Sequence, residues 1–147
     1  VLAGAVASGT VISGGSLNNF GLLTGAAGTA LRFAGANGLL VLGSGGTISG
    51  GIAGLTTGDT LDFVGLSATG ATISGTSLLV TSGGVTVSSL ALIGTSTGLA
   101  FSAGADGSGG TDITVTSASL DGTTVFSGQT LTISAGQTVS GTIVSAG

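Results

Sequence analysis

The sequence predicts an all-β fold, and within that class a parallel β-solenoid of short stacked coils of about 18–20 residues each. Apolar residues occur in twos and threes between Gly, Ser and Thr, which is typical of many short strands joined by tight turns. The letters T-V-F-S at 124–127 return as T-I-V-S at 142–145, an offset of 18 residues. The phrase S-G-T-V-I-S-G-G at 8–15 closely matches S-G-T-I-V-S-A-G at 140–147. A repeat of this length suits one coil of a solenoid.

Composition supports strands over helices and over disorder. The chain has 147 residues, 32 of them Gly, and no Pro, Cys, Met, Trp, Tyr or His. A hydrophobic content of 41% and a mean hydropathy of +0.79 are too high for a disordered chain. Frequent Gly disfavours helices, and the longest apolar run, at 39–42, is far too short to span a membrane. We expect one continuous domain over 1–147, as a segment of a longer chain or a subunit of a fibre.

Charge excludes two classes of partner. Arg32 is the only cation, and the net charge is −4. Binding to nucleic acid or to an anionic membrane surface requires several Lys or Arg side chains, so we expect neither. The short apolar runs predict no membrane insertion. The five anions are Asp59, Asp62, Asp106, Asp112 and Asp121.

In the first half of the chain, the elements follow from short apolar groups. The phrase at 8–15 predicts a strand, the adjacent Asn18 and Asn19 a corner, and residues 21–29 one weak strand and a turn. Leu31 and Phe33 alternate with Arg32, so Arg32 should point outward. The inward series then continues at short intervals, and Gly58-Asp59 predicts a turn before a strand at 60–64. The members of this inward series are Leu40, Leu42, Ile48, Ile52, Leu55, Leu61 and Phe63.

In the second half, apolar groups predict strands at 71–73, 78–81, 85–87, 90–93, 99–101 and 113–115. Residues 102–112 are poor in apolar side chains and should form a loop, after which the closing repeats occupy 123–147. Both ends carry the same phrase without Pro or charge, so we expect them to be uncapped. The expected partners are copies of the chain stacked head to tail, or flanking repeats of the same chain.

The chain lacks the residue types that nucleophilic catalysis requires. Without His, Lys or Cys, the chain can build neither a Ser-His-Asp triad nor a Ser-Lys dyad nor a Cys nucleophile. Asp59 and Asp62 could act as acid and base, but turn formation and solvation explain them as well. We therefore expect no enzyme, and we assign no catalytic, cofactor-binding or metal-binding residue.

Two binding hypotheses stay open beside this interpretation. The text G-S-G-G-T-D at 107–112 is similar to the calcium-binding nonapeptide G-G-x-G-x-D, with Asp106 as a further ligand. It departs at Ser108 and occurs once, so an ordinary Asp/Gly loop is the alternative. Thr residues at alternate strand positions could form a flat array that binds ice or carbohydrate, although Thr is also simply common in strands. The Thr residues of this possible array are Thr86, Thr114, Thr116, Thr130 and Thr132.

The closing repeats resemble the Gly/Ser/Thr repeats of diffuse-adherence autotransporter adhesins of Gram-negative bacteria. The text from Leu31 to Leu42 and from Ile52 to Phe63 resembles a module of exported proteobacterial surface proteins, as does D-G-S-G-G-T at 106–111. The resemblance implies a right-handed β-helix passenger at the bacterial cell surface or outside the cell, and it carries over no ligand residue. We therefore expect a structural or adhesive fibre protein, with a module that binds carbohydrate or ice on a flat Ser/Thr face as the alternative.

Overall fold

The computed structural model describes residues 1–119, 123–127, 129–133, 137 and 139–144. Its regular elements are all β-strands, which confirms the all-β class. Among the residues so described there is no helix long and apolar enough to cross a membrane. Asp121 and the last three letters of the closing repeat, 145–147, lie outside the described residues.

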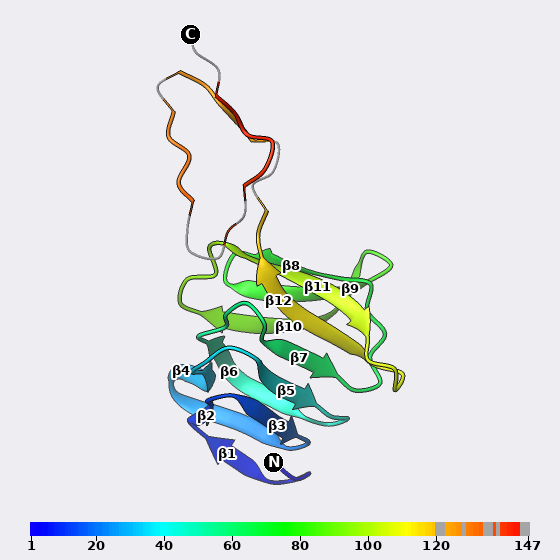
Figure 1. The fold of residues 1–147 in the computed structure, drawn as a ribbon. Helices are drawn as coiled ribbons and strands as arrows, with labels where there is room; N and C mark the ends of the chain where they lie inside the picture. Colours follow the sequence, from blue (N-terminus) through cyan, green and yellow to red (C-terminus); the bar gives the residue numbers. More distant parts are fainter. Residues whose placement is uncertain (120–122, 128, 134–136, 138, 145–147) are drawn as a thin grey trace.

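Within the described residues, twelve strands form the body in two sheets, and two short strands form a separate pair (Figure 1). The larger sheet has the order β1-β4-β6-β10-β9-β8, with β2 also paired to β4; the smaller has the order β11-β12-β7-β5-β3. The strands are β1 (Val6–Ser8), β2 (Thr10–Ile12), β3 (Gly15–Asn19), β4 (Leu22–Phe33), β5 (Gly38–Leu42), β6 (Thr47–Ala53), β7 (Thr60–Phe63), β8 (Gly70–Ser74), β9 (Ser77–Ser82), β10 (Val85–Ile93), β11 (Leu99–Ala105), β12 (Thr111–Ser117), β13 (Thr124–Val125) and β14 (Ile143–Val144).

Parallel pairing joins the strands of the first half. Val6 lies opposite Leu22, Thr10 opposite Leu31 and Gly15 opposite Gly38, which are offsets of 16, 21 and 23 residues. The pairs β4–β6 and β5–β7 continue this direction. The offsets differ from one pair to the next, so they do not describe a uniform coil.

Antiparallel pairing dominates the second half and shows that the predicted parallel β-solenoid is wrong. β8, β9 and β10 pair antiparallel, as do β7, β12 and β11, so both sheets are mixed. The physical reason lies in the connections. Gly83 and Gly84 join β9 to β10 with φ of +56° and +85°, the conformation of a two-residue hairpin turn. Gly75, with φ of +58°, begins a similar two-residue turn between β8 and β9.

One hydrophobic core lies between the two sheets. It is formed by inward side chains of both sheets, with Leu31 and Phe33 from β4 facing Leu40 and Leu61 from β5 and β7. Arg32 is exposed between its two buried neighbours, as the alternation predicted. The predicted inward series is also confirmed: Leu40, Leu42, Ile52, Leu61 and Phe63 are buried, whereas Ile48 and Leu55 are partly buried against this core.

Two local predictions were wrong. Residues 102–112 are not one loop, because β11 extends to Ala105 and β12 begins at Thr111. Residues 22–29 all belong to the twelve-residue β4 and are not a strand followed by a turn, although the pairing of β4 with β6 shifts register between Thr24 and Thr29. At the predicted corner of Asn18 and Asn19, Asn19 ends β3 where the chain bends and crosses to β4 of the larger sheet. Asn19 is fully buried there: its Nδ2 donates to Thr47 O at 3.1 Å and its Oδ1 accepts from Gly21 N at 3.2 Å.

The two ends of the body differ. At one end lie β1, β2 and β3, close to the N-terminus (Figure 1). At the other end, β8 and β11, the last strands of the two sheets, lie in contact. The segment that carries β13 and β14 projects from this second end, far from β1 (Figure 1).

Candidate functional site

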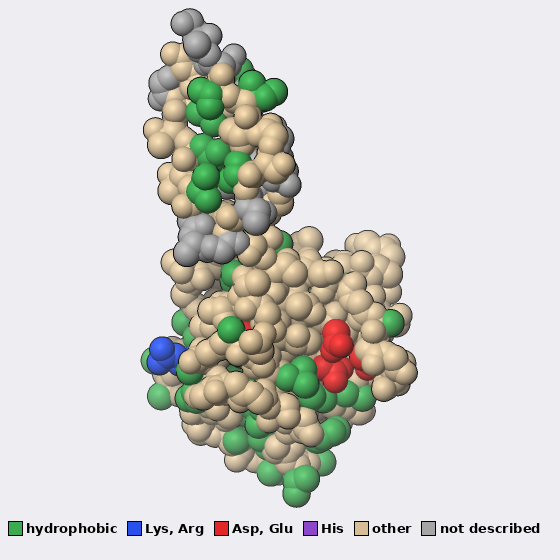
Figure 2. Space-filling model, viewed as in Figure 1, with side chains coloured by type: hydrophobic (Ala, Val, Ile, Leu, Met, Phe, Trp, Pro, Cys, Tyr) green, Lys and Arg blue, Asp and Glu red, His purple; other side chains and the backbone are tan. Residues whose placement is uncertain are grey.

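Three of the five acidic side chains gather in an open groove on the smaller sheet. Asp62 of β7, Asp112 of β12 and Asp106 of the β11–β12 loop line it, together with Asn37 and Thr60, around a volume of about 470 Å³. Figure 2 shows this acidic patch on one side of the view and the positively charged side chain on the other. No cation of the chain therefore neutralises the groove.

Asp62 is the electrostatically unusual member of this groove. It lies opposite Asp112 in the β7–β12 ladder, and its Oδ1 is buried without a hydrogen-bond partner. Burial raises the pKa of the Asp62 carboxyl above its ordinary value of 3.8, and the negative charges of Asp112 and Asp106 raise it further. The folded protein therefore binds a proton at Asp62 more readily than the unfolded chain does.

Replacing Asp62 with asparagine should raise the melting temperature at pH 7 by about 1–3 °C. The raised pKa means that ionised Asp62 destabilises the fold, so stability falls as the pH rises from 3.8 through the raised pKa. The gain should therefore shrink as the pH is lowered toward 3.8, in melts followed by circular dichroism. Asp106→Asn is the control and should give no gain at pH 7. A gain from Asp62→Asn that does not change with pH would contradict the account.

Asp106 organises the loop that resembles a calcium site. Its Oδ1 accepts backbone hydrogen bonds from Ser108 N at 2.6 Å and Gly110 N at 2.9 Å, and these bonds lower the pKa of Asp106. Asp112, the last residue of the motif, lies in strand β12 beside Asp62. Within the part of the chain that the structure covers, no group of three or more potential ligands could hold a metal ion. Nothing in the geometry favours calcium, and the expectation of no cofactor stays a prediction.

Asp59 and Asp62 have different surroundings. Asp59 is fully buried: its Oδ1 accepts from Gly38 N at 2.8 Å, and its Oδ2 accepts from Thr56 N at 2.8 Å and Thr56 Oγ1 at 3.2 Å. These bonds close the turn before β7 and tie it to the start of β5. Asp59 is thus a structural residue, and the interpretation of the two carboxylates as acid and base gains no support. That the protein is not an enzyme stays a prediction.

The Thr residues of the proposed flat array lie in different parts of the fold. Thr86 is in β10 of the larger sheet, whereas Thr114 and Thr116 are in β12 of the smaller one. Thr130 and Thr132 are exposed in the C-terminal segment. These five residues therefore do not form one surface, and no observation favours the ice-binding or carbohydrate-binding alternative.

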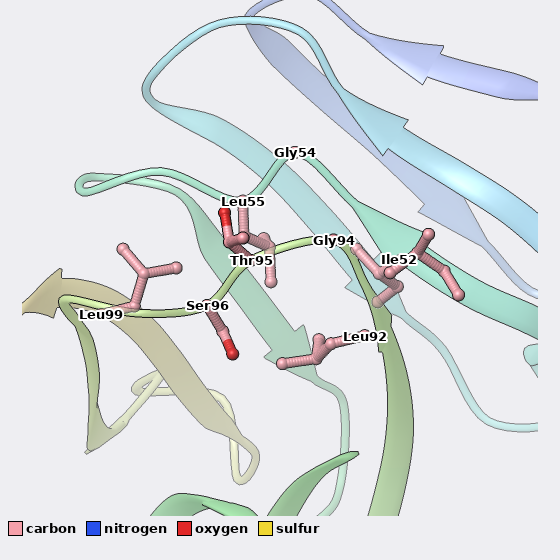
Figure 3. A pocket seen from close by; sticks show the side chains of 9 residues that line it. Ile52, Gly54, Leu55, Leu92, Gly94, Thr95, Ser96 and Leu99 are labelled. Carbon is pink, nitrogen blue, oxygen red and sulfur yellow. The ribbon is translucent and has the colours of Figure 1, made fainter. Parts of the chain in front are cut away.

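A small cavity lies where the chain leaves β6 and β10 and enters β11 (Figure 3). Ile52, Leu55, Leu92 and Leu99 line it with the backbone of Gly94. Its volume of about 20 Å³ holds about one water molecule, so it is too small for an organic ligand.

The outer edge of β1 and β2 is a second candidate site, because no strand of the described chain covers it. On either side of β1, Ala5 O accepts from Leu22 N and Gly9 N donates to Thr24 O, both residues of β4, at 2.9 Å each. Backbone groups of successive residues point to opposite sides of a parallel strand, so the N–H and C=O of Val6 and Ser8 point away from β4. In β2, Ile12 O accepts from Ala34 N at 2.8 Å, which places the N–H and C=O of Val11 on the outer side.

The side chains of this edge do nothing to block a further strand. Val6 is 64% exposed and Val11 is 54% exposed. Residues 1–20 contain neither Pro nor a charged side chain. Natural proteins usually protect an exposed edge with Lys, Pro or a bulge, so an unprotected edge is a template for strand addition.

Val1 shows how a strand can lie on the neighbouring edge of β3. Its α-amino group donates to Asn18 O at 2.6 Å, and its carbonyl accepts from Phe20 N at 2.8 Å. These two bonds reproduce the pattern of a parallel ladder. The β3 edge therefore accepts a chain that runs parallel to it.

Comparison with protein-family models, with curated proteins and with solved structures found no match to this chain. The resemblance of the closing repeats to autotransporter adhesins stays a hypothesis that rests on the residues alone.

Proposed function

We propose that this chain is a structural or adhesive protein that assembles with copies of itself by adding β-strands at the open edge of β1 and β2. The observation that carries the proposal is the set of unpaired backbone groups at Val6, Ser8 and Val11. Each such group gains a hydrogen bond when another strand pairs with it. The exposed valines beside these groups supply apolar area that assembly would bury.

The low charge of the chain supports the same function. A net charge of −4 over 147 residues gives weak repulsion between copies. All the charged residues lie between positions 32 and 121, so the open edge and residues 123–144 carry none. Like charges opposite each other would destabilise a strand pair. No charged side chains would face each other if the open edge of one copy paired with residues 123–144 of another.

We place this function at the bacterial cell surface or outside the cell. This location is supported by the resemblance of residues 123–147 to the passenger repeats of autotransporter adhesins. A rigid, repeatedly stacked β-structure would serve there as a fibre or an adhesive layer.

The test compares one edge substitution with a matched substitution elsewhere. The unmodified chain should form filaments in negative-stain electron microscopy, with a sedimenting fraction that rises with concentration. Val6→Lys should lower that fraction at least about tenfold, because it places a charge beside the unpaired groups of β1. Val85→Lys is the control, since Val85 is 67% exposed, much like Val6, but lies at the β9–β10 turn.

Two outcomes would overturn the proposal. One is a monodisperse monomer of the unmodified chain at all concentrations in light scattering. The other is equal loss of assembly from Val6→Lys and Val85→Lys, because this would show that charge in general, and not the edge, controls assembly. Circular dichroism of each variant shows whether the fold is retained.

A further inference from the structure

The C-terminal segment contains a second version of the sequence that forms the open edge. β2 and its preceding residues read S-G-T-V-I at 8–12, and the C-terminal segment reads S-G-T-I-V at 140–144. In the structure, the second version also forms a strand, β14, which pairs in parallel with β13. The same short phrase thus forms a parallel ladder strand in two places.

Among the residues that the structure describes, β14 pairs with β13 alone and no strand lies on its other side. Ile143 N donates to Thr123 O at 3.2 Å, so the backbone groups of Ile143 point toward β13. Those of Thr142 and Val144 then point the other way. The side chains of Ile143 and Val144 are 61% and 77% exposed, so β14 presents both free backbone groups and apolar surface.

The free groups of β14 and β2 fit each other in one register. In a parallel ladder, the N–H of Val11 bonds to the C=O of the residue before the one that lies opposite it. The C=O of Val11 bonds to the N–H of the residue after that opposite residue. If Ile143 lies opposite Val11, then Val11 N–H meets Thr142 O, and Val144 N–H meets Val11 O. A shift of one residue would require the groups of Ile143 that β13 already uses.

The positions of the two strands mean that this pairing must occur between copies. β14 projects from one end of the body, whereas β2 lies at the other (Figure 1). Contact between two different surfaces can repeat from copy to copy, and it gives an open chain of molecules when the rotation between copies does not close a ring.

We propose that β14 of one copy pairs in parallel with the outer edge of β2 of the next copy, with Ile143 beside Val11 and Val144 beside Ile12. Ile12 is buried at the end of the core, so Val144 would extend the core across the junction. This inference rests on the proposed assembly and names the segment that fills the open edge.

The test uses disulfide crosslinking, which the absence of natural cysteine makes clean. In the double variant Val11→Cys/Ile143→Cys, oxidised glutathione accepts the two electrons as the thiols of neighbouring copies join. The proposed register puts the two Cα atoms about 5 Å apart, within the range for a disulfide. Most of the protein should then form covalent multimers larger than dimers on a non-reducing gel. Val85→Cys/Ile143→Cys is the matched control and should give at least about tenfold less of these multimers.

A second variant tests the backbone bonds directly. Val144→Pro removes an N–H that points away from β13, so it should leave β13–β14 intact and lower the assembled fraction at least about tenfold. If the unmodified chain assembles but the Val11/Ile143 variant gives no more multimers than its control, another segment fills the edge and this inference is wrong while the proposed function stands. If the unmodified chain does not assemble, both are wrong.

Discussion

Replacing Asp59 with alanine should lower the free energy of unfolding by about 2–4 kcal/mol. The substitution leaves the buried backbone N–H of Gly38 and the partly buried backbone N–H of Thr56 without their acceptor. It also disconnects the turn before β7 from the start of β5. Urea denaturation followed by circular dichroism at low protein concentration measures the change, because assembly would otherwise add to the apparent stability.

Asp112→Ala provides the comparison for Asp59→Ala. Asp112 lies in the same sheet, but it is only partly buried and faces Asp62. Its removal should change the free energy of unfolding by no more than about 0.5 kcal/mol. An equal loss from both substitutions would mean that the bonds of Asp59 do not hold the turn.

Replacing Phe33 with alanine should cost about 3–5 kcal/mol. Phe33 is 1% exposed and packs across the core against Gly38 of the other sheet. A Cβ atom at Gly38 would lie 2.7 Å from the Phe33 ring and 3.0 Å from Ile12, so the absence of a side chain at Gly38 makes room for the ring. Truncation of Phe33 therefore leaves a cavity that neither sheet can fill without moving its backbone.

Phe126→Ala separates burial from residue type. Phe126 is 59% exposed, so its truncation should change stability by no more than about 0.5 kcal/mol in the same urea experiment. The interpretation of Phe33 as a central core residue would be wrong if the two substitutions had similar effects.

The positions of the core residues could be predicted because they depend on local alternation. Leu31 and Phe33 point inward and Arg32 outward, since successive side chains of a strand lie on opposite faces. The burial of Leu40, Leu61 and Phe63 follows from the same rule and needs no knowledge of which strands are neighbours.

The pairing of strands could not be predicted in the same way, because a repeated phrase does not say which strand it meets. The offset of 18 in the closing repeats suggested one uniform coil, whereas the parallel pairs of the body have offsets of 16, 21 and 23. One available signal was overlooked. Gly83-Gly84 between two strands of alternating residues is a strong indication of a hairpin, and it contradicts parallel coils in that region.

No residue of the candidate sites was assigned from the sequence. The phrase shared by 8–12 and 140–144 led only to the expectation of uncapped ends, which stays a prediction. The burial of Asp59 and the closeness of Asp62 to Asp112 were missed. Both depend on contacts between residues far apart in the chain, and Asp62 meets Asp112 only through the antiparallel β7–β12 pair.

The two kinds of strand connection also bear on the order in which the chain acquires structure. β8, β9 and β10 are joined by two-residue turns, whereas β1, β4 and β6 must close offsets of 16–25 residues before they pair. Loop closure costs more entropy as the loop lengthens, and isolated hairpins form within about 1–10 μs. The hairpins of residues 70–93 should therefore form early, and the Ala91–Ile93 stretch of β10 then waits for β6 to arrive. During that interval the nascent protein exposes a transient edge that is absent from the finished fold.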